Sequence, residues 1–236
     1  MTSKKVKRTV FGVIALATVV AISLILWSSA EAGNSNTKTT SDVIWTFAAN
    51  PVGSSTLVRN AGGLHADFST SGLAPGQAMT LWFIVFNNPE ACEAGPFVCG
   101  PEDMGADAPA QGDFLLASGN VIGDDGDATF GGSLKAGDVG GSGLAEFPGG
   151  CLPGLPDCGG PIGLVNLDGA LVVLAVHSHG PAQTGQVLKE QISSYLGGCE
   201  IFTGTLPGGF SANAGELPVN DGECATIQVS PHAPAP

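Results

Sequence analysis

The sequence predicts an all-β fold, an antiparallel β-sandwich with long, disulfide-stapled loops and one short helix. Of its 236 residues, 36 are glycine and 16 are proline, and they separate short runs rich in Val, Ile, Leu, Phe and Thr. This punctuation is typical of β-proteins, and hardly any window has helical periodicity. Two runs, 81–86 and 170–176, are apolar at both odd and even positions. They predict strands at the centre of the sandwich, where both faces are covered.

Further strands are predicted where polar and apolar residues alternate between turn-forming residues. Between two such runs, the segment Asp124-Asp125-Gly126-Asp127 predicts a tight hairpin, because Asp-Gly tolerates the positive φ of its turn. A calcium loop is the alternative, but the spaced carboxylates of an EF-hand are missing. The predicted strands cover residues 42–48, 55–59, 63–70, 78–87, 113–122, 127–135, 169–178 and 224–229.

One helix is predicted, over residues 185–198. Its apolar residues fall on one face, and two glycines end it. The connections 88–112 and 136–162 are too long for ordinary turns inside a compact domain. The apolar helix face consists of Leu188, Ile192, Tyr195 and Leu196.

The N-terminus predicts export. A basic stretch precedes the apolar run Val10–Trp27, and the small-residue motif Ala30-Glu31-Ala32 follows it. This order is typical of a signal peptide, here residues 1–32, and the mature chain then begins at Gly33. The apolar run has 18 residues, which is also near the minimum for a membrane span, so an uncleaved anchor stays open as the alternative. Export places the protein outside the cell, in the periplasm or on the cell surface, with membrane contact only if the signal is retained.

The rest of the chain divides into a polar linker (33–41), one sandwich domain (42–229) and a proline-rich tail (230–236). Without the signal peptide, four basic residues face 20 acidic ones, the 21 of the full chain less Glu31, so the net charge is −16. Such a surface repels nucleic acid, since phosphate contacts need clustered Lys or Arg. The four remaining basic residues are Lys38, Arg59, Lys135 and Lys189.

Six cysteines in an exported chain predict disulfides. Two pairs are each separated by six residues that include Gly and Pro, so the chain can fold back on itself, and the last two cysteines then pair across 24 residues. Fifteen pairings are formally possible, and the others stay open. Each short bridge stabilises the fold by about 2.5 kcal/mol and the longer one by about 3.5 kcal/mol in the loop-entropy model. The predicted pairs are Cys92–Cys99, Cys151–Cys158 and Cys199–Cys224.

Histidines form the one pattern that could carry chemistry. His177 and His179 lie two residues apart at the end of a predicted strand, so both imidazoles project from the same face. His65 and Asp67 repeat this spacing in another strand. If the two strands are neighbours, three imidazoles and a carboxylate could hold zinc or copper. The competing interpretation is a structural histidine pair, because His177 shares its parity with apolar residues of its strand.

Three segments carry a resemblance to known proteins. These are GLAPGQAMTLWFIVFNNPEACEAGPFVCG, DATFGGSL and AVHSHGPAQTG, and together they resemble a group of uncharacterised secreted bacterial proteins. More distantly, residues 60 to 200 resemble the sandwich of the CHRD and Cu,Zn superoxide dismutase type, which implies an Ig-like or superoxide dismutase-like fold. In the dismutases a histidine pair lies on the strand that here reads LWFIVFN. This strand has no histidine, so the resemblance implies a fold and no reaction.

Other catalytic patterns are missing from the sequence. No G-x-S-x-G nucleophile turn and no phosphate-binding loop followed by lysine is present, and adjacent carboxylates such as Glu102-Asp103 are typical of surface charge. We therefore expect an exported, disulfide-stabilised, non-enzymatic binding or surface-associated module. Its partner is expected to be an extracellular ligand or surface component, and no cofactor is expected. The alternative is a zinc or copper protein that uses His177, His179 and His65.

Overall fold

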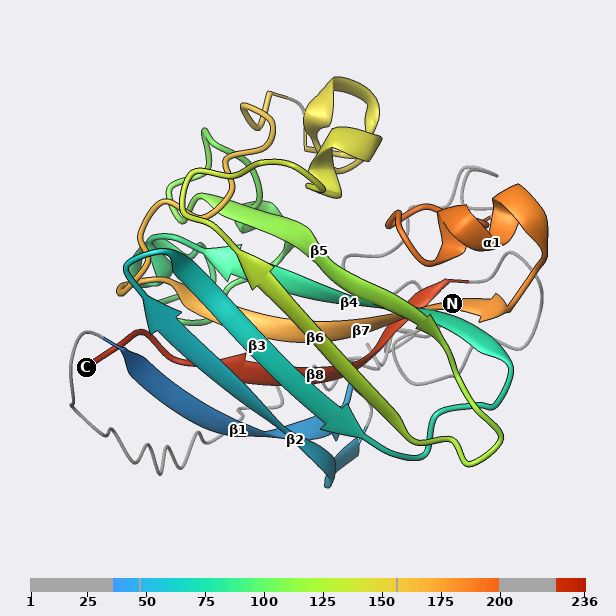
Figure 1. Cartoon of the computed structure of the whole chain (residues 1–236). Coiled ribbons are helices and arrows are strands. Elements are labelled where there is room, and N and C mark those ends of the chain that lie inside the picture. Colours follow the sequence, from blue (N-terminus) through green and yellow to red (C-terminus); the bar gives the residue numbers. More distant parts are fainter. Residues whose placement is uncertain (1–35, 47, 156, 200–223) are drawn as a thin grey trace, which may run out of the picture.

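A computed structural model describes residues 36–46, 48–155, 157–199 and 224–236 of the chain. These residues form one eight-stranded, antiparallel sheet in the order β5-β4-β7-β8-β1-β2-β3-β6 (Figure 1). The fold is therefore mostly antiparallel sheet, as predicted. The strands are β1 (Thr37–Trp45), β2 (Ala48–Asn60), β3 (Gly63–Thr70), β4 (Gln77–Phe86), β5 (Gly112–Val121), β6 (Ala128–Leu134), β7 (Leu171–Pro181) and β8 (Ala225–His232).

The sheet curls into a nearly closed, barrel-like sandwich. Its two edge strands, β5 and β6, lie against each other, although no strand ladder joins them in the described part of the chain (Figure 1). They approach closely because position 132 is glycine. A Cβ at Gly132 would lie only 2.7 Å from the Cβ of Ala117 on β5. The missing side chain therefore lets the two edges meet.

This edge contact corrects the predicted hairpin. Asp125 and Gly126 do form a tight turn, with Gly126 at φ +72°, but the strands on either side of it are not paired. β5 pairs with β4 and β6 pairs with β3. The turn is bonded instead to a distant loop, since the Leu73 N–H donates to the Gly126 carbonyl at 3.0 Å.

The sheet is longer at both chain ends than the sequence predicts. β1 begins at Thr37, so residues 37–41 belong to the sheet and not to a linker. β8 continues through residues 230–232, which were predicted as tail. Residues 37–41 extend the sheet because they pair with β2 from Arg59 to Ser55. The predicted signal peptide, 1–32, lies outside the described residues.

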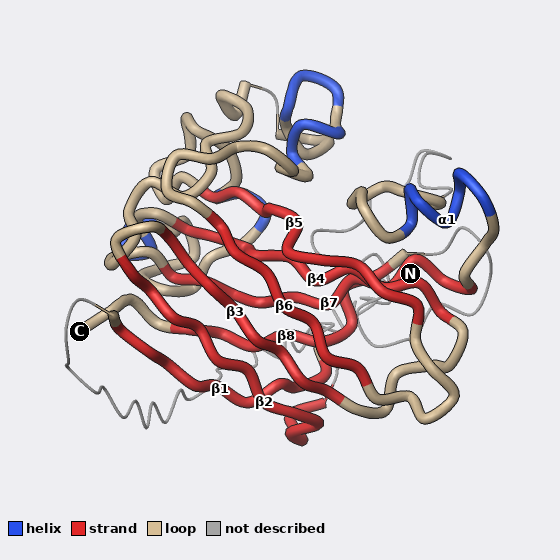
Figure 2. Tube along the Cα trace, viewed as in Figure 1, coloured by secondary structure: helices blue, strands red, loops and turns tan. Residues whose placement is uncertain are grey.

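Strand β4 separates two apolar cores, because all ten of its residues are buried. Alternate side chains point into the barrel, where Leu81, Phe83 and Val85 join an inner core with residues from the other strands. The long loops lie beside β4 and β5 (Figure 2). The remaining side chains of β4 point outward into a second core, which includes residues of these loops. We call this the outer core. It contains Trp82, Ile84, Phe86, Phe114, Leu171 and Ala175 from strands, and Cys92, Met104, Ala110, Leu144, Phe147 and Tyr195 from loops.

In β4 and β7, side chains at both odd and even positions are buried, which confirms that the two apolar runs are central strands. The loops that cover them contain four short 3-10 turns and two of the disulfides. The loop carrying Cys92–Cys99 follows β4, and the loop carrying Cys151–Cys158 precedes β7. The turns are η1 (Pro89–Ala91), η2 (Pro101–Asp103), η3 (Leu144–Glu146) and η4 (Pro148–Gly150).

Buried polar side chains fix these loops to the sheet. The Asp113 carboxylate accepts hydrogen bonds from the Ser142 hydroxyl (2.6 Å) and from the N–H groups of Gly163 (2.7 Å) and Ile162 (3.0 Å). Burial raises the pKa of this carboxyl, while the hydrogen bonds oppose that shift. Because each such bond would be costly to lose in the interior, the carboxylate determines where the loop before β7 lies.

Asn87 fixes the same loop at the end of β4. Its amide oxygen accepts from the N–H groups of Val165 (2.7 Å) and Asn166 (3.0 Å), and its amide nitrogen donates to the Gly163 carbonyl (2.9 Å). The side chain is 1% exposed. A single amide thereby replaces the backbone partners that the loop lacks.

The predicted helix is shorter than expected. Helix α1 (Gly185–Gln191) stops seven residues early, and the chain folds back through a turn that carries Tyr195. The reversal depends on Gly197, because a Cβ there would lie 2.0 Å from the Glu190 carbonyl oxygen. Glu146 holds the turn by accepting from the Tyr195 N–H at 2.7 Å and the Leu196 N–H at 2.9 Å. These contacts outweigh the helical pattern of residues 192–196.

The disulfides are Cys92–Cys99, Cys151–Cys158 and Cys199–Cys224, the pairs that the spacing predicts. Three disulfides indicate an oxidising environment such as the outside of a cell. In the described parts of the chain, no helix has the length and apolar character needed to cross a lipid bilayer.

We predict that Gly132→Ala lowers the free energy of unfolding by about 1–3 kcal/mol, because the new methyl group forces β5 and β6 apart. Gly131→Ala is the matched control. Its Cβ would have no neighbour nearer than 3.4 Å, so its stability should be close to that of the natural chain. Urea denaturation of both variants measures the difference. Equal stability of the two variants would contradict the proposed edge contact.

Candidate functional site

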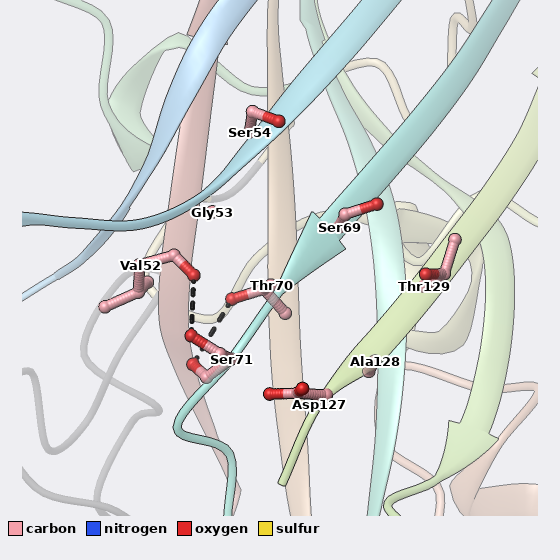
Figure 3. Close-up of a pocket in the computed structure, with 9 residues that line it drawn as sticks. All are labelled: Val52, Gly53, Ser54, Ser69, Thr70, Ser71, Asp127, Ala128 and Thr129. Atoms are coloured by element: carbon pink, nitrogen blue, oxygen red, sulfur yellow. Dashed lines mark hydrogen bonds between the residues drawn. The ribbon is translucent and has the colours of Figure 1, made fainter.

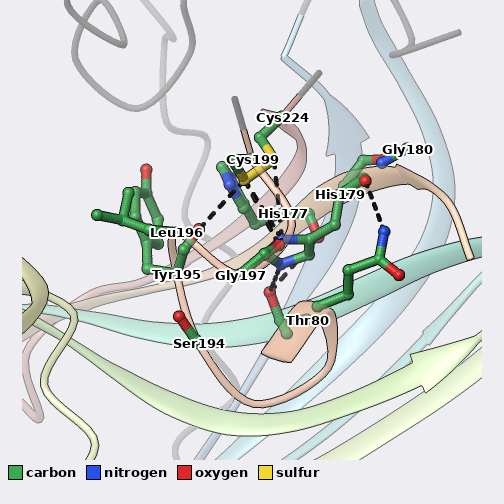
Figure 4. Close-up of a disulfide and its surroundings, with 12 residues drawn as sticks. Thr80, His177, His179, Gly180, Ser194, Tyr195, Leu196, Gly197, Cys199 and Cys224 are labelled. Atoms are coloured by element: carbon green, nitrogen blue, oxygen red, sulfur yellow. Dashed lines mark hydrogen bonds between the residues drawn. A yellow bond between two sulfur atoms is a disulfide. The ribbon is translucent and has the colours of Figure 1, made fainter. Parts of the chain in front are cut away.

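Two buried histidines near the end of β7 lie beside the Cys199–Cys224 disulfide (Figure 4). They project from the outward face of the strand into the outer core, as the shared parity predicts. His177 is 4% exposed and His179 is fully buried. Their rings meet edge to face, with centroids 4.9 Å apart.

His179 is held at both ring nitrogens. Nδ1 lies 2.8 Å from the Gly197 carbonyl oxygen and therefore carries the proton that it donates. Nε2 accepts from the Thr80 hydroxyl at 2.9 Å, and that hydroxyl accepts from the Trp82 indole N–H at 2.7 Å. This chain of bonds connects β4, β7 and the turn after α1. In the oxidised protein, His179 therefore has a structural role.

His177 is held differently. Its ring stacks on Tyr195, with centroids 4.3 Å apart and an angle of 20° between the planes. Nδ1 lies 3.3 Å from the Thr226 hydroxyl oxygen on β8. Nε2 is buried and makes no hydrogen bond to any described residue. One nitrogen of the pair therefore remains available to a ligand.

Both imidazoles are neutral at pH 7. Burial lowers the pKa of His179 to about 4, and the Gly197 carbonyl opposes the shift. The pKa of His177 is well below its usual value because of burial, and the neighbouring His179 lowers it further. Neutral imidazole is also the form that binds metals.

The structure does not bring His65 and Asp67 to this site. They lie on β3, which pairs with β2 and β6, whereas the histidine pair lies on β7. The condition for a shared site, that the two strands be neighbours, is therefore not met. The His65 side chain is 51% exposed, with Nε2 3.8 Å from an Asp67 oxygen and Nδ1 3.0 Å from the Ser133 hydroxyl. Sequence spacing found both pairs but could not show that strand order separates them.

A second candidate site is the outward face of β1, β2, β3 and β6, which the long loops leave uncovered. Strand register places Ser54, Ser69 and Thr129 in one row across β2, β3 and β6 (Figure 3). All three are exposed. Parallel rows lie beside this one, and together we call them the hydroxyl face. It includes Lys38, Thr40, Asp42, Ser54, Thr56, Val58, His65, Asp67, Ser69, Thr129 and Ser133.

A shallow groove of about 580 Å³ lies at one end of the hydroxyl face. Ser54, Ser69 and Thr129 line it, and Asp127 adds a carboxylate (Figure 3). The Ser71 hydroxyl at its edge donates to the Val52 carbonyl at 3.0 Å, which holds the loop after β3 in place. The groove thus presents several hydroxyl groups and one negative charge on a fixed backbone.

The sequence interpretation missed two buried ionisable residues between the strands. His232, predicted as part of the tail, lies 2.8 Å from the Thr39 hydroxyl and 2.7 Å from that of Ser55. Burial, with a contribution from Arg59, lowers the pKa of His232 to about 3. The inward alternation of Ser55, Leu57 and Arg59 could have indicated the buried arginine.

Arg59 is 1% exposed and donates to three backbone carbonyls. Burial lowers its pKa to about 10, and Asp168 partly offsets that shift. The side chain therefore stays charged at neutral pH, and it joins the loop before β7 to the C-terminal segment. The three carbonyls belong to Leu167, Ala170 and Ala233.

No protein-family model matches the chain, and no curated protein matches it significantly. The geometry of the two candidate sites is therefore what points to a function.

We predict that acid destabilises the oxidised protein between about pH 6.5 and pH 4. The pKa values of His177, His179 and His232 are lowered in the folded state, so the unfolded chain binds more protons in this range. The free energy of unfolding therefore decreases as the pH is lowered, by up to about 1.4 kcal/mol per pH unit for each histidine. The raised pKa of Asp113 acts in the opposite direction. Urea denaturation at several pH values, with the disulfides intact, measures this slope.

The variant His232→Gln should reduce this slope by up to about 1.4 kcal/mol per pH unit, the contribution of one proton. The matched control is His65→Gln, on the exposed face of β3. A free energy of unfolding that stays constant across this pH range would contradict the prediction.

Proposed function

We propose that the chain is an exported, disulfide-stabilised binding module that performs no catalysis and attaches to a neutral polysaccharide at a cell surface. The hydroxyl face is the proposed binding surface. The observation that carries the proposal is its row of exposed hydroxyls, Ser54, Ser69 and Thr129, in register across three strands.

The spacing of these hydroxyls suits an extended, hydroxyl-rich polymer. Neighbouring strands lie about 4.8 Å apart, and side chains on one face recur at every second residue, so the face presents a regular grid. Each Ser or Thr hydroxyl can both donate and accept, as can each sugar hydroxyl. A shallow, regular surface can therefore form repeated hydrogen bonds along a chain of sugars.

Charge favours a neutral partner over an anionic one. The face and its groove carry the carboxylates of Asp42, Asp67 and Asp127 against the ammonium of Lys38, and the full chain has a net charge of −13. Anionic polymers would be repelled by this surface. Neutral sugars avoid that repulsion and can donate hydrogen bonds to the carboxylates.

The two sides of the sandwich differ in a way that supports the proposal: one is covered by loops, and the other is the open hydroxyl face. Loops cover β4 and β7, and their buried anchors hold that wall rigid, while the hydroxyl face stays open. A rigid scaffold lowers the entropy cost of binding because few groups must be ordered.

We predict that Ser69→Arg combined with Thr129→Arg lowers polysaccharide binding at least tenfold. The two long side chains fill the groove and replace two hydroxyls, which donate and accept, with guanidinium groups, which only donate. About 1.4 kcal/mol corresponds to a tenfold change. Pull-down on insoluble cellulose, chitin and cell-wall preparations, followed by titration of the best binder, measures the change.

The matched control is Ser193→Arg, since Ser193 is exposed in the turn after α1 and outside the hydroxyl face. This control should bind like the natural chain. The proposal fails if the natural chain retains none of these polymers, or if the double variant binds as well as the control.

A further inference from the structure

We propose that the histidine pair and the Cys199–Cys224 disulfide form a redox-gated zinc site. When this disulfide is reduced, the two cysteine thiolates and the imidazoles of His177 and His179 bind one Zn²⁺ ion. When it is oxidised, the site is closed. This inference is independent of the hydroxyl face.

The four side chains already lie close enough together. One ligand atom from each lies within 4.8 Å of the others. Nδ1 of His179 is 3.6 Å from Sγ of Cys199 and 3.9 Å from Sγ of Cys224 (Figure 4). Tetrahedral zinc, with bonds of about 2.3 Å to sulfur and about 2.0 Å to nitrogen, places these atoms about 3.5 Å apart. The two sulfur-to-nitrogen distances of His179 therefore already suit zinc, whereas the two bonded sulfur atoms must separate.

The ligand set selects the metal. Two thiolates and two imidazoles in tetrahedral geometry are typical of zinc. Nε2 of His177 is buried and has no hydrogen-bond partner among the described residues, and it can bind zinc in the tautomer whose Nδ1 donates to the Thr226 hydroxyl. A buried nitrogen without a partner is costly unless a ligand satisfies it in some state of the protein.

His179 can change its tautomer and keep one of its two supporting hydrogen bonds, the one to Thr80. To bind zinc through Nδ1, it must give up its bond to Gly197 and carry its proton on Nε2, which then donates to the Thr80 hydroxyl. Thr80 can accept this bond because its own hydroxyl hydrogen has another acceptor, the His177 carbonyl at 3.5 Å. Support of the second ring nitrogen by a neighbouring group is typical of histidine ligands in metal sites.

The redox step is a thiol–disulfide exchange. A dithiol reductant supplies two electrons and two protons, which cleave the Cys199–Cys224 bond to two thiols, while the reductant becomes a disulfide. Zinc then displaces the two thiol protons and undergoes no redox change. Both cysteines are only partly buried, so a reductant can reach them. Reoxidation would release the metal.

The test is zinc titration of the full mature chain before and after reduction, without oxygen. Reduced protein should bind one zinc equivalent at this site, and oxidised protein none. Co²⁺ should give the visible bands of a tetrahedral thiolate site. His177→Gln and His179→Gln should each weaken zinc binding at least tenfold while keeping all six thiols, and His65→Gln, the matched control, should not.

Alkylation mapped by mass spectrometry identifies which sulfurs are involved. Zinc should protect Cys199 and Cys224 of reduced protein from the reagent, and leave Cys151 and Cys158 reactive. This readout matters because Cys92, Cys99 and Asp103 form another close group. Protection of that group alone, zinc binding that does not need the histidines, or no zinc binding by folded reduced protein would each overturn the proposal. Circular dichroism confirms that each variant is folded.

Discussion

The structure depends on the need to bury both faces of β4. One set of its side chains fills the barrel, and the other set, with Trp82 at its centre, would be exposed unless something covers it. Leaving a side chain of this size in water forfeits roughly 2 kcal/mol or more. The long connections after β4 and before β7 provide that cover, which explains why loops so rich in Gly and Pro are ordered. Trp82, Phe114 and Tyr195 meet there in edge-to-face and tilted ring contacts.

Loops of this composition have few regular backbone hydrogen bonds, so individual polar side chains replace them. Asp113 and Asn87 hold the loop before β7, and Glu146 holds the turn that carries Tyr195. Each side chain binds several N–H groups of a segment distant in sequence. The disulfides stabilise these loops further, because they restrict the conformations open to the unfolded chain. Together these contacts convert irregular segments into a second, rigid wall.

The two walls consequently have different chemistry. The covered wall holds neutral histidines beside the Cys199–Cys224 disulfide, in surroundings that exclude most water. The open wall presents hydroxyls and carboxylates in rows set by strand register. Buried imidazoles beside partly buried sulfur atoms are suited to a metal, whereas an exposed polar grid is suited to a polymer. The difference between the walls follows from which strands the loops cover.

The sequence by itself determined the features that depend on local pattern. Alternation and turn residues located all eight strands, the both-parity runs identified β4 and β7 as central, and short cysteine spacings indicated the disulfide pairs. Strand order and register are long-range properties, which local patterns do not specify. Only the tertiary structure therefore decided that β3 lies far from β7, that β5 and β6 meet at Gly132, and that the chain reverses at Gly197 to place Tyr195 on His177. Both candidate sites arise from these long-range contacts, because each joins residues from elements that are distant along the chain.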